Sequence, residues 1–261
     1  MLKIGWFSTG NGEGSLGFIK YFLEYIKKNN LDISLEYVFV NREYGEQQGS
    51  DNFINYLKIN KINTITLSSK NFKKKNFNQP FFKYRREYDL EVKNLISSYD
   101  TDLIVMAGYM LILSDILCNE FRFINLHPAL PKGPKGTWVD VIKYLISNNI
   151  TESGLNVHVV TNKLDAGQSI GYCNFSYANF NEEWEEYYEL TKNSKKINYQ
   201  NLKLFSLIRN QILDREKILL LCVIEEFLKN KQKLEDVFHE PDKLRLLKSI
   251  NYSSRIDAML S

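Results

Sequence analysis

The chain has 261 residues, of which 44% are hydrophobic and 25% are charged, and its formal net charge is +3. This composition agrees with a soluble protein and suffices for one large hydrophobic core. The charge is small and spread over segments of mixed sign, and no basic face interleaved with aromatic side chains stands out. Composition therefore gives no case for nucleic-acid binding.

The sequence gives no sign of a membrane segment or of a metal site. The N-terminus lacks a charged stretch followed by a long apolar one, and the apolar run at residues 219–224 is too short to span a bilayer. The cysteines Cys118, Cys173 and Cys222 are widely separated and show no metal-ligand spacing, so we expect reduced thiols. We predict a cytoplasmic protein without a bound metal.

Apolar strand-like runs alternate with helical patterns along the chain, which predicts an α/β fold with a mostly parallel, twisted sheet and helices on both faces. Strands are expected at residues 2–8, 33–40, 64–67, 103–107, 123–126, 157–160 and 169–175. Helices are expected near residues 16–29, 51–60, 86–99, 110–119, 138–147 and 199–229.

The domain organisation follows from where these patterns weaken. We predict one domain over residues 1–234 and a weakly specified C-terminal extension over 235–261. Within the domain, residues 176–198 contain the acidic and aromatic stretch EEWEEYYE, which reads best as a solvated helix with one aromatic face. A lid or a partner surface are the alternatives for this insertion.

The first expected strand runs into the glycine-rich stretch TGNGEGS at residues 9–15, and a helix follows. Backbone N–H groups of such a turn, together with the helix N-terminus, can bind an anion such as a phosphate. The stretch lacks the lysine of a P-loop and does not fit the G-x-G-x-x-G pattern. On its own it is a weak indication of a phosphate site.

The segment Asn125-Leu126-His127-Pro128 lies at the end of an apolar run, and Asp165 follows about forty residues later in the turn LDAG. Residues i and i+2 of a strand point the same way, so Asn125 and His127 can face one cavity at its C-terminal edge. A carboxamide, an imidazole and a carboxylate are suited to acyl-group chemistry. The alternative is that these motifs have no catalytic role, because Asn-x-His occurs by chance in many proteins and Asp-x-Gly is an ordinary turn.

Three longer stretches favour the catalytic interpretation. They are residues 106–114 (MAGYMLILS), 124–131 (INLHPALP) and 157–167 (VHVVTNKLDAG). In order and approximate spacing they resemble the folate-dependent formyltransferases, over roughly residues 1–230, and the closest branch of that family acts on glycinamide ribonucleotide. The resemblance implies a Rossmann-like formyltransferase fold. It also implies transfer of a formyl group from 10-formyltetrahydrofolate to the amine of glycinamide ribonucleotide, a step of purine biosynthesis, or to a related amine.

The resemblance assigns site residues by position. The catalytic residues would be Asn125, His127 and Asp165. Acceptor contacts would come from the N-terminal loop and from a C-terminal helix, at Asn11, Gly12, Ser15 and Glu216. Folate contacts would come from Arg86, Met110, Leu111, Ile112, Leu113 and His158.

Some of these assignments have a simpler structural interpretation, and some positions depart from the family. His158 could be a satisfied, half-buried strand residue, and Glu216 a solvated helix carboxylate. Arg85 and Arg86 could both be solvent-facing charges at a helix start. The family often has Arg where this chain has Leu111, which should weaken recognition of a carboxylated folate tail or shift that task to a lysine.

Two other functions remain open from the sequence. One is N-formylation of a nucleotide-linked amino sugar, and the other is a folate- or nucleotide-binding module without catalysis. The expected partners are a small-molecule amine and folate, with no nucleic acid and no membrane. The oligomeric state is expected to be a monomer or a homodimer.

Overall fold

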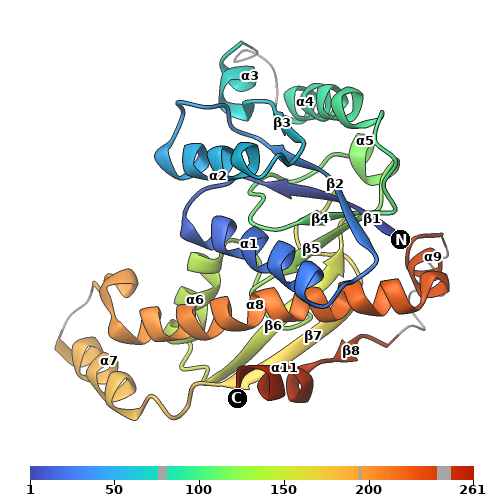
Figure 1. The fold of residues 1–261 in the computed structure, drawn as a ribbon. Helices are drawn as coiled ribbons and strands as arrows, with labels where there is room; N and C mark the ends of the chain where they lie inside the picture. Colours follow the sequence, from blue (N-terminus) through green and yellow to red (C-terminus); the bar gives the residue numbers. More distant parts are fainter. Residues whose placement is uncertain (76–80, 194–195, 240–247) are drawn as a thin grey trace. The chain divides into compact units, whose positions relative to one another are not determined.

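The computed structural model describes residues 1–75, 81–193, 196–239 and 248–261 (Figure 1). Its backbone contacts separate the chain into two compact units, and each of them is built from segments that are distant in the sequence. The first unit comprises Met1–Leu126, His158–Gln168 and Ile224–Leu246, and the second comprises His127–Val157, Ser169–Val223 and Leu247–Ser261.

The first unit contains a parallel sheet with the strand order β3-β2-β1-β4-β5. Because all neighbouring pairs are parallel, the carboxyl ends of these strands lie at one edge, the usual place for a ligand in an α/β fold. The prediction of a mostly parallel sheet is confirmed. The strands are β1 (Leu2–Ser8), β2 (Ile33–Val40), β3 (Thr64–Thr66), β4 (Leu103–Met106) and β5 (Phe123–His127).

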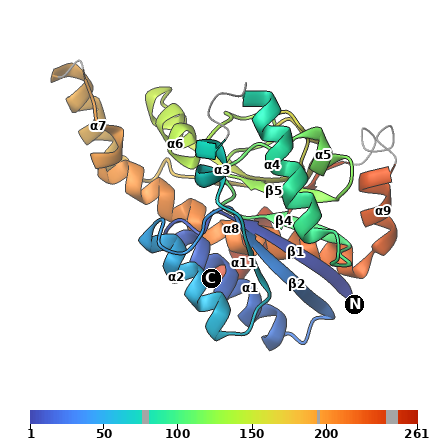
Figure 2. The ribbon, with the colours of Figure 1, turned by 90° about the horizontal axis from the view of Figure 1, so that it is seen from above.

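Helices cover both faces of this sheet, as β1 shows. Trp6 packs against Phe18 and Phe22 of α1 (Glu13–Lys28), with ring centroids 5.5 and 5.1 Å apart. The next residue, Phe7, points to the opposite face, where it belongs to a buried cluster with Tyr88 of α4 (Phe81–Ile96). Figure 2 shows α1 and α4 on opposite sides of β1 and β2.

One expected helix of the first unit is much shorter than its pattern suggested. The apolar residues 110–119 were expected to be helical, but α5 covers only Asp115–Cys118. The backbone before it is bound by side chains from elsewhere: Met110 N donates to Thr9 Oγ1 and Ser114 N donates to Asp89 Oδ2. These tertiary bonds replace the internal bonds of a helix. The other helices of the unit are α2 (Gln48–Ile59), α3 (Ser69–Lys75) and α9 (Lys231–His239).

The second unit contains the remaining three strands, in the order β6-β7-β8. The strands are β6 (Glu152–Val159), β7 (Ser169–Ser176) and β8 (Ile250–Asn251), and the last residues of β6 belong to the first unit. The helices are α6 (Trp138–Ser147), α7 (Asn181–Asn193), a 3-10 turn (Tyr199–Asn201), α8 (Lys203–Lys229) and α11 (Ser253–Leu260), and the part of α8 from Ile224 onward belongs to the first unit.

The end of the chain is better ordered than the sequence suggested. Residues 240–247 of the expected extension lie outside the described residues. After them, β8 pairs in parallel with β7, and Tyr252 N donates to Tyr172 O at 2.8 Å. Ile256 of α11 is fully buried. The expectation of a weakly specified tail is therefore wrong for residues 248–261.

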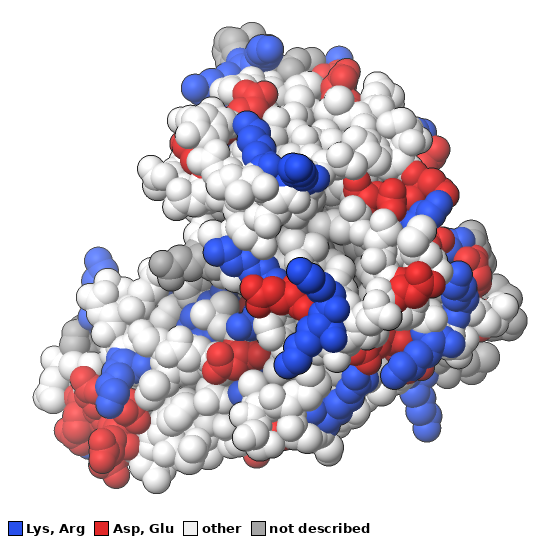
Figure 3. Space-filling model, in the orientation of Figure 1, with Lys and Arg blue, Asp and Glu red and all other residues white. Residues whose placement is uncertain are grey.

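The acidic and aromatic insertion forms the helix α7, and residues 194–195 of it lie outside the described residues. Trp184 and Tyr187 are buried, and the ring of Trp184 stacks on Tyr177. The acidic side chains Glu182, Glu185, Glu186 and Glu189 are exposed on the same helix, and acidic atoms gather over α7 in Figure 3. The expectation of a solvated helix with one aromatic face is confirmed.

The 27-residue helix α8 is long enough to cross a bilayer, but it carries charged side chains along its length. Within the described parts of the chain, no helix combines the length and the hydropathy that a membrane span requires.

Candidate active site

Three of the expected site residues meet at the end of β5. The amide nitrogen Nδ2 of Asn125 lies 3.3 Å from His158 Nε2, and Asp165 Oδ1 lies 3.7 Å from the same ring nitrogen. The side chains of His158 and Asp165 are 4% and 9% exposed, so little water reaches them. The structure thus places a carboxamide, an imidazole and a carboxylate together.

The hydrogen bonds of His158 fix how its ring can act. Its Nδ1 lies 2.8 Å from the carbonyl oxygen of Val159, which can only accept, so Nδ1 carries a proton. In the neutral imidazole, Nε2 is then an acceptor, and the Asn125 amide donates to it. Both ring nitrogens of His158 thus have a polar partner, and one of these partners is the Asn125 amide.

Asp165 reaches this cluster because of the tight turn in which it lies. Its φ of +45° is in the left-handed region, which Asp tolerates better than most residues. Two residues later the turn presses against β6, where a Cβ at Gly167 would lie 1.6 Å from Val159 O. The turn closes with Val159 N donating to Gln168 O at 3.0 Å. In the turn LDAG, the left-handed backbone thus favours Asp at position 165, and the close approach of Val159 O requires Gly at position 167.

His127 is the last residue of β5 and the first of the second unit. Its side chain is largely buried, and Nε2 donates to the carbonyl oxygen of Pro134 at 2.8 Å. Because Nε2 carries this proton, Nδ1 holds the lone pair of the neutral ring. The loop that supplies Pro134 includes Lys132 at a φ of +68°, and Lys135 is exposed on it.

The glycine-rich loop after β1 has two glycines in the left-handed region of the backbone. Gly10 and Gly12 have φ values of +66° and +96°, and Gly10 N donates to Ser8 Oγ at 3.1 Å. Gly12 is the N-cap of α1 and offers no side chain to its first turn. The N-terminal N–H groups of a 16-residue helix are oriented toward this loop, where they favour an anion.

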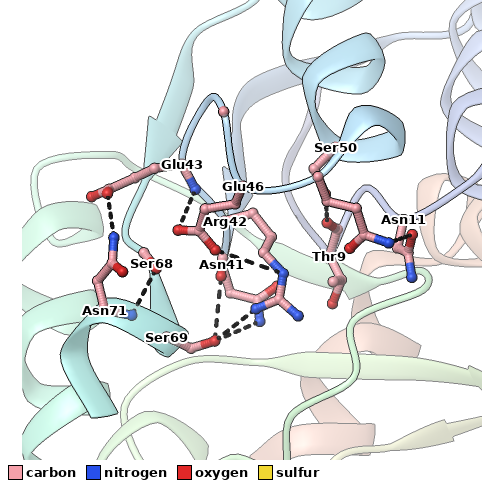
Figure 4. A network of polar contacts seen from close by, with 12 residues as sticks. Thr9, Asn11, Asn41, Arg42, Glu43, Glu46, Ser50, Ser68, Ser69 and Asn71 are labelled. Atoms are coloured by element: carbon pink, nitrogen blue, oxygen red, sulfur yellow. Dashed lines mark hydrogen bonds and ion pairs between the residues drawn. The ribbon is translucent and has the colours of Figure 1, made fainter. Parts of the chain in front are cut away.

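A polar network that no sequence motif indicated adjoins this loop (Figure 4). Ser50 Oγ donates to Thr9 O, and Gln47 Nε2 donates to Asn11 Oδ1 at 2.7 Å. Beside it, Arg42 donates to Ser69 Oγ at 3.3 Å. The available signal was positional: Asn41 and Arg42 directly follow the buried strand β2, at the same sheet edge as Thr9.

Four of the six expected folate residues, Met110 to Leu113, lie on the loop between β4 and α5, whereas Arg86 lies on α4 and His158 on β6. Met110 and Ile112 are 56% and 40% exposed, whereas Leu113 is buried. Leu111 is partly buried and packs against the aromatic core cluster of the first unit. The side chains of the loop thus alternate between solvent and core, and two apolar residues remain available for the apolar ring of a ligand.

The two arginines at the start of α4 differ strongly. The guanidinium of Arg86 is half exposed and forms an ion pair with Asp115. Arg85 is buried, donates from Nε to Ile112 O, and lies 3.0 Å from Asp89, so a solvent-facing interpretation is wrong for Arg85. Burial raises the pKa of Asp89, and the Arg85 charge opposes that shift.

In the second unit, Glu216 is a partner of Arg209 rather than a solvated carboxylate. Arg209 Nη1 lies 3.2 Å from Glu216 Oε1, and its guanidinium lies 4.4 Å from the ring centroid of Trp138. The Glu216 side chain is only 14% exposed. Burial raises its pKa, and the charge of Arg209 counteracts this.

Comparison with known proteins decides the family. Residues 23–199, more than half of the chain, match the family described as formyl transferase. A phosphoribosylglycinamide formyltransferase of Dictyostelium discoideum is 30% identical over 174 residues, which is 62% of this chain and 77% of that protein. The chain belongs to the formyl transferase family. A phosphoribosylglycinamide formyltransferase of Escherichia coli (strain K12) is 36% identical over 91 residues, 34% of this chain and 42% of that protein.

Solved structures agree with the formyl transferase fold. A phosphoribosylglycinamide formyltransferase from Bacillus halodurans superimposes with a TM-score of 0.64 over 91% of this chain and all of that chain, at 18% identity. At this identity the likeness concerns the fold. The Rossmann-like fold and the formyltransferase class that the sequence motifs implied are therefore confirmed, whereas the role of each site residue remains a prediction.

Proposed function

We propose that this formyltransferase transfers the formyl group of 10-formyltetrahydrofolate to the amine of glycinamide ribonucleotide in purine biosynthesis. The observation that carries the proposal is the orientation of the Asn125 amide by His158, with Asp165 beside them, in a chain whose curated relatives are named phosphoribosylglycinamide formyltransferase. A held amide N–H is what stabilises charge on a carbonyl oxygen during acyl transfer.

Each catalytic residue has a role that its chemistry permits. When the amine attacks the formyl carbon, negative charge develops on oxygen and positive charge on nitrogen. Asn125 donates an N–H to the oxygen, and His127 moves the proton from the amine toward the departing folate nitrogen. Asp165, whose Oδ1 lies 3.7 Å from His158 Nε2, is the third residue of the proposed catalytic set. The proposal assigns the proton transfer to Nδ1 of His127, because Nε2 is bound to Pro134 O.

The acceptor would be held through its phosphate by the glycine-rich loop, at Asn11, Gly12 and Ser15. The positive φ values of Gly10 and Gly12 and the start of α1 support this assignment. Glu216 would accept hydrogen bonds from ribose hydroxyls through the oxygen that does not face Arg209.

The donor would be bound by the loop of Met110, Leu111, Ile112 and Leu113. The resemblance to the family assigns His158 and Arg86 to the donor as well. The exposed apolar side chains of Met110 and Ile112 fit a flat, largely apolar ring. Leu111 packs toward the core and carries no charge for a folate tail carboxylate, so we assign that contact to Arg86, whose guanidinium is half exposed.

The test is a formyl-transfer assay with 10-formyltetrahydrofolate and glycinamide ribonucleotide, which follows the release of tetrahydrofolate. The wild type is compared with Asp165→Asn, and a nucleotide-linked amino sugar serves as the second acceptor. We expect turnover with glycinamide ribonucleotide that is lost in the variant. Turnover with the amino sugar alone would contradict the proposed acceptor, and binding of both substrates without turnover would contradict catalysis.

A further inference from the structure

Thr9 begins the segment that the proposed function assigns to the acceptor, and it contacts a second segment that the proposed function assigns to the donor. Thr9 directly follows β1, and only 2% of its surface is exposed. The acceptor loop is defined here as residues 9–15, and the donor loop as residues 108–114. A buried polar residue at this position must satisfy its backbone and hydroxyl groups within the protein.

Two hydrogen bonds of Thr9 hold the start of the donor loop. Its backbone N donates to Gly108 O at 3.0 Å, and its Oγ1 accepts from Met110 N at 3.1 Å. The bonds fit because Gly108 has a φ of +70°, which turns the chain back toward Thr9. The hydroxyl therefore fixes the backbone of a residue assigned to the folate.

The same residue is tied to the acceptor side. Thr9 O accepts from Ser50 Oγ at 3.1 Å, and Ser50 lies in the first turn of α2 (Figure 4). That turn rests on the acceptor loop, since a Cβ at Gly49 would lie 2.7 Å from Gly12 N. The two loops also touch directly: a Cβ at Gly108 would lie 2.8 Å from Ser15 Oγ.

From these contacts we propose that Thr9 is a positioning residue that couples the two loops, so that binding of one substrate strengthens binding of the other. A ligand that orders the acceptor loop also fixes the Thr9 bonds to Gly108 and Met110, and the second ligand then loses less entropy on binding. Coupling of this kind is reciprocal. The inference rests on the proposed function, because that function supplies the two ligands.

The test measures binding without reaction. Tetrahydrofolate, which has no formyl group to transfer, is titrated into the protein with and without saturating glycinamide ribonucleotide. We expect glycinamide ribonucleotide to tighten tetrahydrofolate binding by about five-fold or more in the wild type. Thr9→Val, which replaces the hydroxyl by a methyl group of similar size, should bring this factor close to one. Thr9→Ser keeps the acceptor for Met110 N and should retain the coupling.

A second measurement does not depend on the folding of a variant. In the wild type, glycinamide ribonucleotide alone should slow hydrogen exchange of the Met110 amide, although Met110 lies in the donor loop and not in the acceptor loop. Unchanged exchange over residues 108–114 would overturn the inference, as would full coupling in Thr9→Val. A wild type that does not bind glycinamide ribonucleotide would contradict the proposed function itself, and so the two failures are distinguishable.

Discussion

Asn125 can stabilise an oxyanion only if its amide N–H groups point in a fixed direction. The neighbouring His158 supplies this by accepting one N–H, while its own Nδ1 is bound to Val159 O. Because a small misplacement of a catalytic group can cost a large factor in rate, a residue that only orients Asn125 should still matter for turnover.

Substitution of His158 tests this orienting role. In His158→Phe, an aromatic ring remains but Asn125 loses its hydrogen-bond partner, so we expect kcat to fall by about ten-fold or more while the pH–rate profile keeps its shape. Steady-state kinetics across pH is the measurement, and His158→Asn, which restores a hydrogen-bonding group, should recover part of the rate. An unchanged kcat in His158→Phe would rule the role out.

Single residues differed in how well the sequence predicted them. Asn125 and Asp165 carry motif signals, and the sequence also predicted the strand end at which Asn125 lies. The burial of Arg85 could not be predicted, because the pattern of α4 does not distinguish Arg85 from Arg86. Only the donor loop and Asp89 decide which of them turns inward. The pairing of Glu216 with Arg209 could not be predicted either, because Trp138, which packs on the Arg209 guanidinium, is distant in the sequence.

At the scale of elements, the donor loop is non-helical because α4 binds its backbone. Asp89 is fully buried and accepts from Ser114 N at 2.5 Å, while Arg85 binds Ile112 O. Periodicity alone favoured a helix for residues 110–119, since the loop has apolar residues at helical spacing. The competing tertiary hydrogen bonds are invisible in a single sequence.

Breaking the Arg85–Asp89 pair should loosen this loop. Asp89→Asn leaves the buried Arg85 charge without its partner, which we expect to cost about 3 kcal/mol of unfolding free energy and to raise the KM for the folate donor. The control is Lys93→Gln on the same helix, which breaks the more exposed pair with Glu120 and should cost less than about 1 kcal/mol. Urea unfolding and donor kinetics are the measurements. Equal losses in both variants would contradict the account.

The start of α6 gives a prediction about pH. Thr137 and Asp140 form a capping box, and the hydrogen bonds from Thr137 lower the pKa of Asp140 below its ordinary 3.8. A lowered pKa means that the stabilisation is present above 3.8 and is lost as the pH falls through the lowered value. Thr137→Ala should therefore cost about 1 kcal/mol at neutral pH. The difference should shrink in strong acid, and urea unfolding at both pH values checks this.

At the scale of the whole molecule, the alternation of strands and helices predicted the parallel sheet of the first unit nearly to the residue for β1 and β2. The reason is that buried parallel strands form continuous apolar runs. β8 could not be predicted, because two residues carry no periodicity and their pairing with β7 is a tertiary event. The boundary between a domain at 1–234 and an extension at 235–261 remains a prediction.

Removal of residues 248–261 tests the contribution of the chain end. Tyr252 contacts the backbone of β7 near Gly171, and Ile256 is fully buried, so truncation should expose the edge of β7 and apolar surface. We expect a melting temperature lower by several degrees, measured by thermal unfolding. Truncation without loss of stability would show that this segment packs too loosely to matter.

We propose that His127 moves a proton in this formyltransferase while a formyl group passes to glycinamide ribonucleotide. The most direct measurement is single-turnover formyl transfer by the wild type and by His127→Ala, together with tetrahydrofolate binding to both. We predict a rate lower by about 10²- to 10⁴-fold in the variant, with binding and folding retained. Near-normal transfer by His127→Ala would contradict the account.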